Sequence, residues 1–117
     1  MNEDSSLLCH VNLANGFRGG ERQTLLLIRA LSERGFKQKL IARKDSELTK
    51  RCQSMGGLDV IESNIFGLNA FSKISQKPLF HFHDSRSFSF FYLHNLNKDL
   101  NYIYTRRVQR SPKMSFI

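Results

Sequence analysis

Three short motifs in this chain join residue types that bind or transform ligands in enzymes. The first is Gly16-Phe17-Arg18-Gly19-Gly20, in which three glycines fall within five positions just before a helical pattern. A helix start offers unpaired backbone N–H groups and a positive dipole end to a phosphate, and glycine lets the ligand approach closely. The spacing fits neither the dinucleotide fingerprint nor the P-loop, so phosphate contact and a plain tight turn are both open interpretations.

The second motif is His81-Phe82-His83-Asp84, at the end of a segment with a strand pattern. Side chains two positions apart on a strand share a face, so His81 and His83 lie together and Asp84 begins the next loop. Histidines and carboxylates transfer protons and bind hydroxyl groups, which makes His83 and Asp84 the candidate catalytic residues. Purely structural histidines are the alternative. No metal site is predicted, because metals need three or four ligands and this motif supplies a histidine pair.

The third motif is Thr105-Arg106-Arg107, at the end of another strand pattern. Arginine holds carboxylate or phosphate through two parallel hydrogen bonds, although a solvated basic strand end explains the motif equally well. Ligands of parallel α/β sheets bind at the carboxyl ends of the strands. The three motifs are therefore predicted to line one cleft.

The elements that must position these motifs alternate between strand and helix patterns. Gly35 is placed to end the first helix, and Asp45 to cap the second. Regular alternation predicts an α/β domain with a doubly wound parallel sheet. The chain is interpreted as one domain, residues 1–117, that is truncated after its last strand. The expected strands are 7–13, 36–43, 58–61, 79–83 and 100–105, and the expected helices are 21–34, 46–55, 68–75 and 85–96.

The composition restricts the class of protein and its partners. A net charge of +8 over 117 residues favours an anionic partner, whether nucleic acid, phosphorylated small molecule or membrane surface. The longest apolar runs, Leu25–Ile28 and Phe90–Leu93, are four residues each, so no transmembrane helix is expected. Cys9 and Cys52 are far apart and fit reduced cytosolic thiols better than a disulfide or a metal pair.

The motifs together resemble glycosyltransferase family 4 enzymes. The segment Arg18-Gly19-Gly20-Glu21, with a helix ending at Arg34-Gly35, is similar to the opening of that family. Phe80–Asp84 resembles the family's fourth strand, and Tyr102–Arg107 resembles its fifth. The similarity covers about residues 6–110. It implies the N-terminal, acceptor-side domain of a retaining GT-B enzyme, Rossmann-like in fold and commonly metal-independent, with a nucleotide sugar as donor and no other cofactor.

The resemblance also assigns roles to individual residues. It implies that Gly19 and Gly20 approach the donor diphosphate, and that His83 and Asp84 line the acceptor side. Many family members have a histidine at the end of the fifth strand, where this chain has Thr105. The full set expected to bind substrate is Arg18, Gly19, Gly20, Glu21, His81, Thr105, Arg106 and Arg107.

The implied function is the assembly of cell-surface polysaccharide or lipopolysaccharide, in the cytoplasm and at the inner face of the membrane. These residues contain no counterpart of the family's donor-binding domain, so we expect the chain alone to be inactive. Its open sheet edge offers a surface for a second copy. The alternatives are a basic nucleic-acid-binding domain and a non-catalytic α/β ligand-binding module. The aromatic cluster at 88–93 lacks interleaved basic residues, which counts against nucleic acid.

Overall fold

The structure, a computed structural model, describes residues 7–63, 78–84, 87–89 and 101–105. The predicted helix at 68–75 and most of the one at 85–96 lie outside these ranges, although 87–89 are helical. Each predicted strand is present, with its ends shifted by at most two residues. The strands are β1 (Leu8–Asn12), β2 (Gln38–Arg43), β3 (Leu58–Ser63), β4 (Leu79–Phe82) and β5 (Tyr102–Tyr104), and the helices are α1 (Gly19–Glu33) and α2 (Glu47–Gln53).

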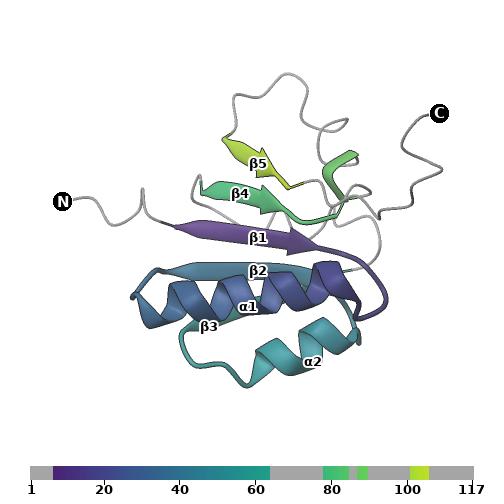
Figure 1. Cartoon of the computed structure of the whole chain (residues 1–117), viewed down its shortest axis with the longest axis horizontal. Helices are drawn as coiled ribbons and strands as arrows, with labels where there is room; N and C mark the ends of the chain where they lie inside the picture. Colours follow the sequence, from purple (N-terminus) through teal and green to yellow (C-terminus); the bar gives the residue numbers. More distant parts are fainter. Residues whose placement is uncertain (1–6, 64–77, 85–86, 90–100, 106–117) are drawn as a thin grey trace.

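All five strands run parallel in one sheet of order β3-β2-β1-β4-β5 (Figure 1). β1 is central, and its residue His10 lies opposite Leu40 on one side and His81 on the other. The strand order reverses between β1 and β4, because the chain builds outward first through β2 and β3 and then through β4 and β5. The prediction of an α/β fold with a parallel sheet is confirmed.

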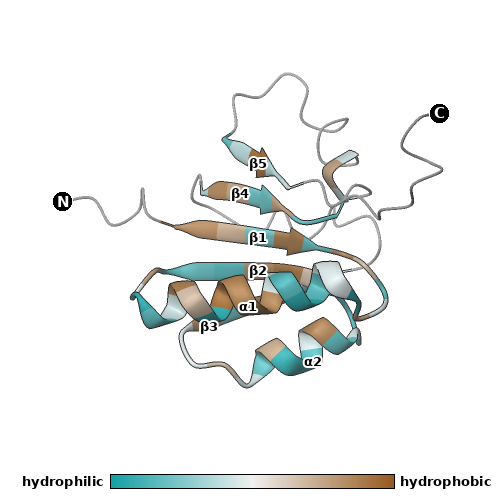
Figure 2. Ribbon diagram, in the orientation of Figure 1, coloured by the Kyte–Doolittle hydropathy of each residue, from teal (hydrophilic) through white to brown (hydrophobic). Residues whose placement is uncertain are grey.

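The two faces of the sheet form two apolar layers. α1 and α2 cover one face (Figure 1), and the middle turns of α1 are coloured as hydrophobic in Figure 2. Leu25 and Ile28 of α1 form a buried cluster with Leu40 of β2. On the opposite face the helical residue Phe88 stacks on Tyr104 with ring centroids 4.6 Å apart. Helical residues therefore pack against both faces. Buried in the α1 layer are Leu25, Ile28, Leu40, Ala42, Leu48 and Cys52, and in the other layer Cys9, Val11, Leu13, Ile41, Phe80 and Phe82.

The start of α1 differs from the sequence-based expectation. The helix begins at Gly19, so Gly19 and Gly20 belong to its first turn, whereas the helix was expected to begin at Glu21. The physical reason is a cap: the Glu21 Oε1 atom accepts a hydrogen bond of 2.8 Å from the backbone N–H of Arg18. This cap offsets the low helix propensity of two consecutive glycines. The other end is confirmed, because Gly35 follows the helix with a φ of 83°.

The cap of α2 is Ser46 rather than the predicted Asp45. The Ser46 hydroxyl accepts a hydrogen bond of 3.1 Å from the backbone N–H of Thr49. Asp45 instead takes the left-handed conformation, with a φ of 64°, in a turn where Ser46 N–H donates to the Arg43 carbonyl. Aspartate tolerates this conformation better than most residues. Asp45 thus lies in the turn, one position before the cap.

Replacing Ser46 by alanine tests this cap. We expect Ser46→Ala to lower the free energy of unfolding by about 1–2 kcal/mol, because Thr49 N–H loses its acceptor in a buried position. Ser54→Ala, at the exposed other end of α2, is the matched control and is expected to change stability by less than about 0.5 kcal/mol. Urea denaturation measures both, and equal effects would contradict the assignment of the cap.

Candidate functional site

The carboxyl ends of β1, β4 and β5 form one edge that gathers most of the predicted site residues. The His83 N–H donates to the Val11 carbonyl at 2.9 Å, and the Thr105 N–H donates to the Phe82 carbonyl at 3.0 Å. The segments that leave these three strands are therefore neighbours. Arg106 and Arg107 lie outside the described residues.

Asp84 has a visible structural role at this edge. Its Oδ1 atom accepts hydrogen bonds from Leu13 N–H at 3.0 Å and from the Ser87 hydroxyl at 2.6 Å. Its Oδ2 atom accepts from the Ser87 N–H at 3.1 Å. Asp84 thereby ties the segment after β1 to the segment after β4 and caps the helical residues 87–89. A role for this carboxylate in proton transfer stays a prediction.

The beginning of α1 presents a glycine and an arginine to the surface. Arg18 and Gly19 are exposed, whereas the capping residue Glu21 is buried and Gly20 is half-buried. A Cβ atom added at Gly19 would meet nothing within 4 Å. Neither packing within the described chain nor an unusual backbone angle requires glycine at this position. The open space in front of Gly19 is the feature that a phosphate-binding helix start needs.

Asn12 connects the end of β1 to the start of α1. Its Nδ2 group donates to the Thr24 hydroxyl at 3.0 Å, and that hydroxyl donates to the Gly20 carbonyl at 2.9 Å. Its Oδ1 atom accepts from the Ala14 N–H at 3.1 Å. All buried side-chain nitrogen and oxygen atoms in the described part of the chain have such a partner. The first turn of α1, which contains Gly19 and Gly20, is therefore held in place by hydrogen bonds that begin at Asn12 in the central strand.

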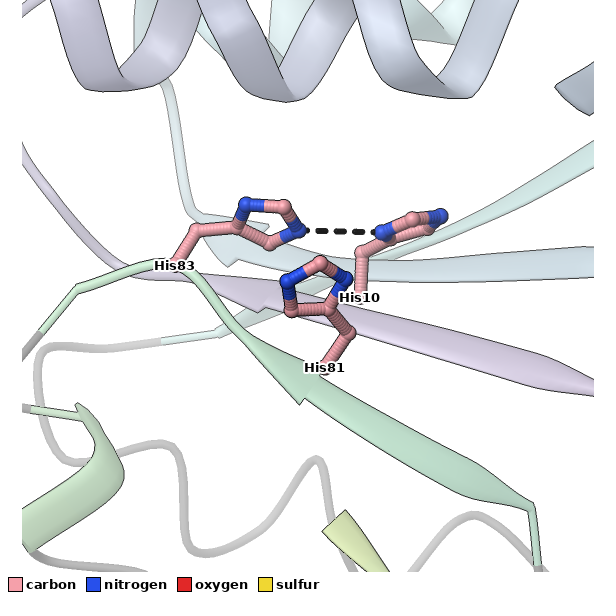
Figure 3. Close-up of side chains that lie close together, drawn as sticks. All are labelled: His10, His81 and His83. Carbon is pink, nitrogen blue, oxygen red and sulfur yellow. Dashed lines mark hydrogen bonds between the residues drawn. The ribbon is translucent and has the colours of Figure 1, made fainter. Parts of the chain in front are cut away.

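Three histidines meet on the face of the sheet that α1 covers (Figure 3). His81 and His83 come from β4 and the residue after it, as predicted, and their rings stack with centroids 4.0 Å apart. The third, His10, comes from β1 and was not predicted as a site residue. His10 Nδ1 lies 3.1 Å from His83 Nε2, and both side chains are buried. His81 is only partly buried, and its Nε2 atom lies 2.6 Å from the Thr105 hydroxyl.

Gln38 determines which ring nitrogen of His10 carries the proton. The Gln38 Nε2 group donates to the Ile28 carbonyl at 3.1 Å and to the Ser32 hydroxyl at 3.0 Å. Its Oε1 atom therefore points at His10 Nε2, 2.7 Å away, and an amide oxygen can only accept. His10 consequently carries its proton on Nε2, and its Nδ1 atom accepts from the N–H of His83. The order of donation is His83 to His10 to Gln38.

Burial keeps His10 neutral. Loss of contact with water lowers the pKa of His10 from 6.5 to about 4, the hydrogen bond to Gln38 opposes this shift, and the nearby charge of His81 adds to it. At neutral pH the imidazole thus has one donor and one acceptor nitrogen, as the hydrogen-bond order requires. Neutral imidazole is also the form that binds metal ions.

The two cysteines lie away from this cluster and are free and buried. Burial raises the pKa of Cys9 to about 12 and that of Cys52 to about 11, so both remain thiols at neutral pH. Cys9 precedes His10 on β1, so its side chain enters the opposite layer of the core. Neither thiol has the environment of a catalytic nucleophile.

A local signal for His10 was present in the sequence. His10 and Asn12 are polar residues on one side of a strand whose other side is apolar. The same alternation in β4 places His81 and His83 on one face. Recognising the cluster required the knowledge that β1 and β4 are neighbours with His10 opposite His81.

No protein family, curated protein or solved structure matches the chain. Within the ranges that the structure describes, no helix is long and apolar enough to cross a membrane. The fold and the site together define an α/β protein with a parallel sheet, a polar edge at the strand ends and a buried histidine cluster between β1 and β4.

The neutral state of His10 predicts how stability depends on pH. The unfolded chain takes up a proton at the ordinary histidine pKa of 6.5, whereas folded His10 does so only near 4. This difference contributes roughly 3 kcal/mol above pH 6.5, and the contribution is lost as the pH falls from 6.5 to 4. We expect His10→Gln to have a shallower loss of stability over this window. Urea denaturation at pH 7 and pH 4.5 measures it, and parallel pH profiles for both proteins would refute the assignment.

Proposed function

We propose that the chain is the N-terminal, acceptor-side domain of a retaining glycosyltransferase with Rossmann-like, GT-B architecture. It moves a sugar from a nucleotide-sugar donor to a cell-surface polysaccharide or lipopolysaccharide acceptor. The observation that carries the proposal is the reversal of strand order between β1 and β4. The glycine turn follows β1, and the pair His83 and Asp84 follows β4, so two of the three motifs flank this point. Ligands of doubly wound folds bind at such a switch point, and the order 3-2-1-4-5 is typical of nucleotide-binding sheets.

The start of α1 is the proposed contact for the donor diphosphate. Its first turn contains Gly19 and Gly20, whose N–H groups precede the first intrahelical hydrogen bonds. The positive end of the helix dipole favours a phosphate there, and the space in front of Gly19 permits close approach. Arg18, exposed beside it, supplies a positive charge to an anionic group of the acceptor.

The proposed acceptor side is the edge at β4 and β5. His83 is held in one orientation by His10, and Asp84 fixes the loop that follows. His81 and Thr105 are partly exposed there and are linked by a 2.6 Å contact. These side chains offer nitrogen and hydroxyl groups that pair with sugar hydroxyls. Arg106 and Arg107 follow directly in the sequence and extend the proposed site toward anionic acceptors.

The positive net charge of the chain supports a location at the membrane surface. A net charge of +8 supports peripheral docking at the anionic inner leaflet, where each Lys or Arg at the surface contributes about 1 kcal/mol. This would place a cytoplasmic enzyme beside lipid-linked acceptors. Donor binding is assigned to a second α/β domain, so the chain by itself is proposed to be inactive.

The gene tests this assignment directly. We expect the nucleotide sequence downstream of the Ile117 codon to encode a second α/β domain, in frame or after a frameshift. The two domains expressed together should transfer sugar from a nucleotide-sugar donor, whereas the chain of 117 residues alone should not. Unrelated downstream sequence, or sugar transfer by the chain unaided, would overturn the proposal of a two-domain enzyme.

Substitution of Gly19 tests the diphosphate contact separately. A methyl group at this position meets no neighbour in the described chain, so Gly19→Ala should fold with unchanged or slightly higher stability. It occupies the space in front of the helix start, and we expect at least tenfold weaker binding of uridine diphosphate.

The matched control for this substitution is Gly56→Ala. Gly56 also has open space around it and no positive φ, but it follows α2, away from the start of α1. Chemical shifts in a titration of the ¹⁵N-labelled two-domain protein with uridine diphosphate give both affinities. Equal affinities for the two variants would place the diphosphate elsewhere.

A further inference from the structure

We propose that His10, His81 and His83 bind a divalent transition-metal ion of the zinc class through three imidazole nitrogens. No metal site was predicted from the sequence, because the motif at residues 81–84 supplies only a pair of histidines. The parallel register of β1 and β4 adds the missing third ligand, since His10 lies opposite His81. One nitrogen from each of the three rings lies within 4.8 Å of the other two.

The distances are close to those of a metal centre. Zinc–nitrogen bonds of about 2.0–2.1 Å in a tetrahedral site place ligand nitrogens roughly 3.3 Å apart. His10 Nδ1 and His83 Nε2 are already 3.1 Å apart. The nitrogen of His81 lies within 4.8 Å of the other two, so zinc binding requires it to move closer by at most about 1.5 Å. Figure 3 shows the His81 ring beside the pair formed by the other two.

The residues around the cluster orient it as the surroundings of a metal centre do. Metal-binding histidines donate the N–H that does not face the metal to an oxygen atom, which fixes the tautomer. The Gln38 oxygen holds His10 Nε2 at 2.7 Å, and the Thr105 hydroxyl holds His81 Nε2 at 2.6 Å. The Gln38 contact leaves the Nδ1 atom of His10 facing His83, and the Thr105 contact fixes the orientation of the His81 ring. The partial exposure of His81 provides a route for the ion.

The donor atoms select the class of metal. Three neutral imidazoles suit zinc, copper or nickel, whereas magnesium and calcium require oxygen ligands. The nearest carboxylate in sequence, that of Asp84, is engaged by Leu13 and Ser87. Cys9 faces the other layer of the core, so no thiolate from β1 joins the site. The proposed ion is Zn²⁺, and its fourth coordination position lies outside the three histidines.

Binding requires one proton to move. In the metal-free protein the His83 Nε2 atom donates to His10 Nδ1, so both nitrogens are occupied by a single N–H···N bond. For zinc to replace this bond, His83 must shift its proton from Nε2 to Nδ1, and the ring stays neutral throughout. His10 keeps its proton on Nε2 and its bond to Gln38. The change in the tautomer of His83 is a direct signature of the site.

The test uses the full chain after removal of metal with a chelator. Titration with Zn²⁺ in competition with a chromophoric indicator measures the affinity, and Co²⁺ replaces zinc as a visible probe of tetrahedral coordination. We expect one ion per chain. His81→Gln and His83→Gln should each weaken binding by 100-fold or more, and Gln38→Leu by 10–100-fold through loss of orientation. The control, a double Cys9→Ala and Cys52→Ala variant, should bind zinc like the unmodified protein.

A second measurement uses the unsubstituted protein, so that its result does not depend on whether a variant folds. Imidazole ¹⁵N shifts of the labelled chain should report the proton of His83 on Nε2 before zinc addition and on Nδ1 after it. Unchanged imidazole shifts at saturating zinc, or binding abolished by the cysteine double variant, would overturn the site. The glycosyltransferase proposal has its own tests, the downstream gene and uridine diphosphate binding, so the failure of one proposal can be distinguished from the failure of the other.

Discussion

The structure depends on satisfying polar side chains at the centre of its sheet. β1 is flanked by β2 and β4 and covered by α1, yet it carries His10 and Asn12, both with 0% exposure. An unpaired buried polar group costs about 1–3 kcal/mol, so each must find a partner inside the protein. Gln38 in β2, Thr24 in α1 and His83 after β4 supply these partners. A shift of one residue in strand register would move the polar groups to the apolar face and break every one of these bonds.

The same bonds shape the edge where the strands end. Asn12 reaches the first turn of α1 through the Thr24 hydroxyl, and Asp84 joins the segments after β1 and β4 through Leu13 N–H. The exposed turn at Gly19 is therefore anchored to the same central strand as the buried histidines. The described residues at this edge are therefore held by hydrogen bonds from buried side chains, which is what a preorganised binding site requires.

The sequence predicted the features that depend on neighbours along the chain. Alternating strand and helix patterns identified the parallel sheet, and Gly35 marked the end of α1 because its φ of 83° suits glycine. Local propensity failed at the start of α1, where the cap from Glu21 outweighs two glycines. It also failed to find the role of His10, whose partner His83 lies 73 residues away. Pairing between β1 and β4 depends on the packing of the whole sheet, and no short pattern encodes it.

The buried histidines connect the two proposals through one physical property. His83 has a fixed orientation when it donates to His10, and a metal ion bound by both rings would fix it as well. Both arrangements need neutral imidazoles and both use Gln38 to hold His10 in place. The conformational entropy of the His83 side chain is thus lost on folding, and ligand binding does not have to order it again. If a sugar hydroxyl binds at this edge, as proposed, it would meet a side chain whose orientation folding has already fixed, whether His10 or a metal ion holds the ring.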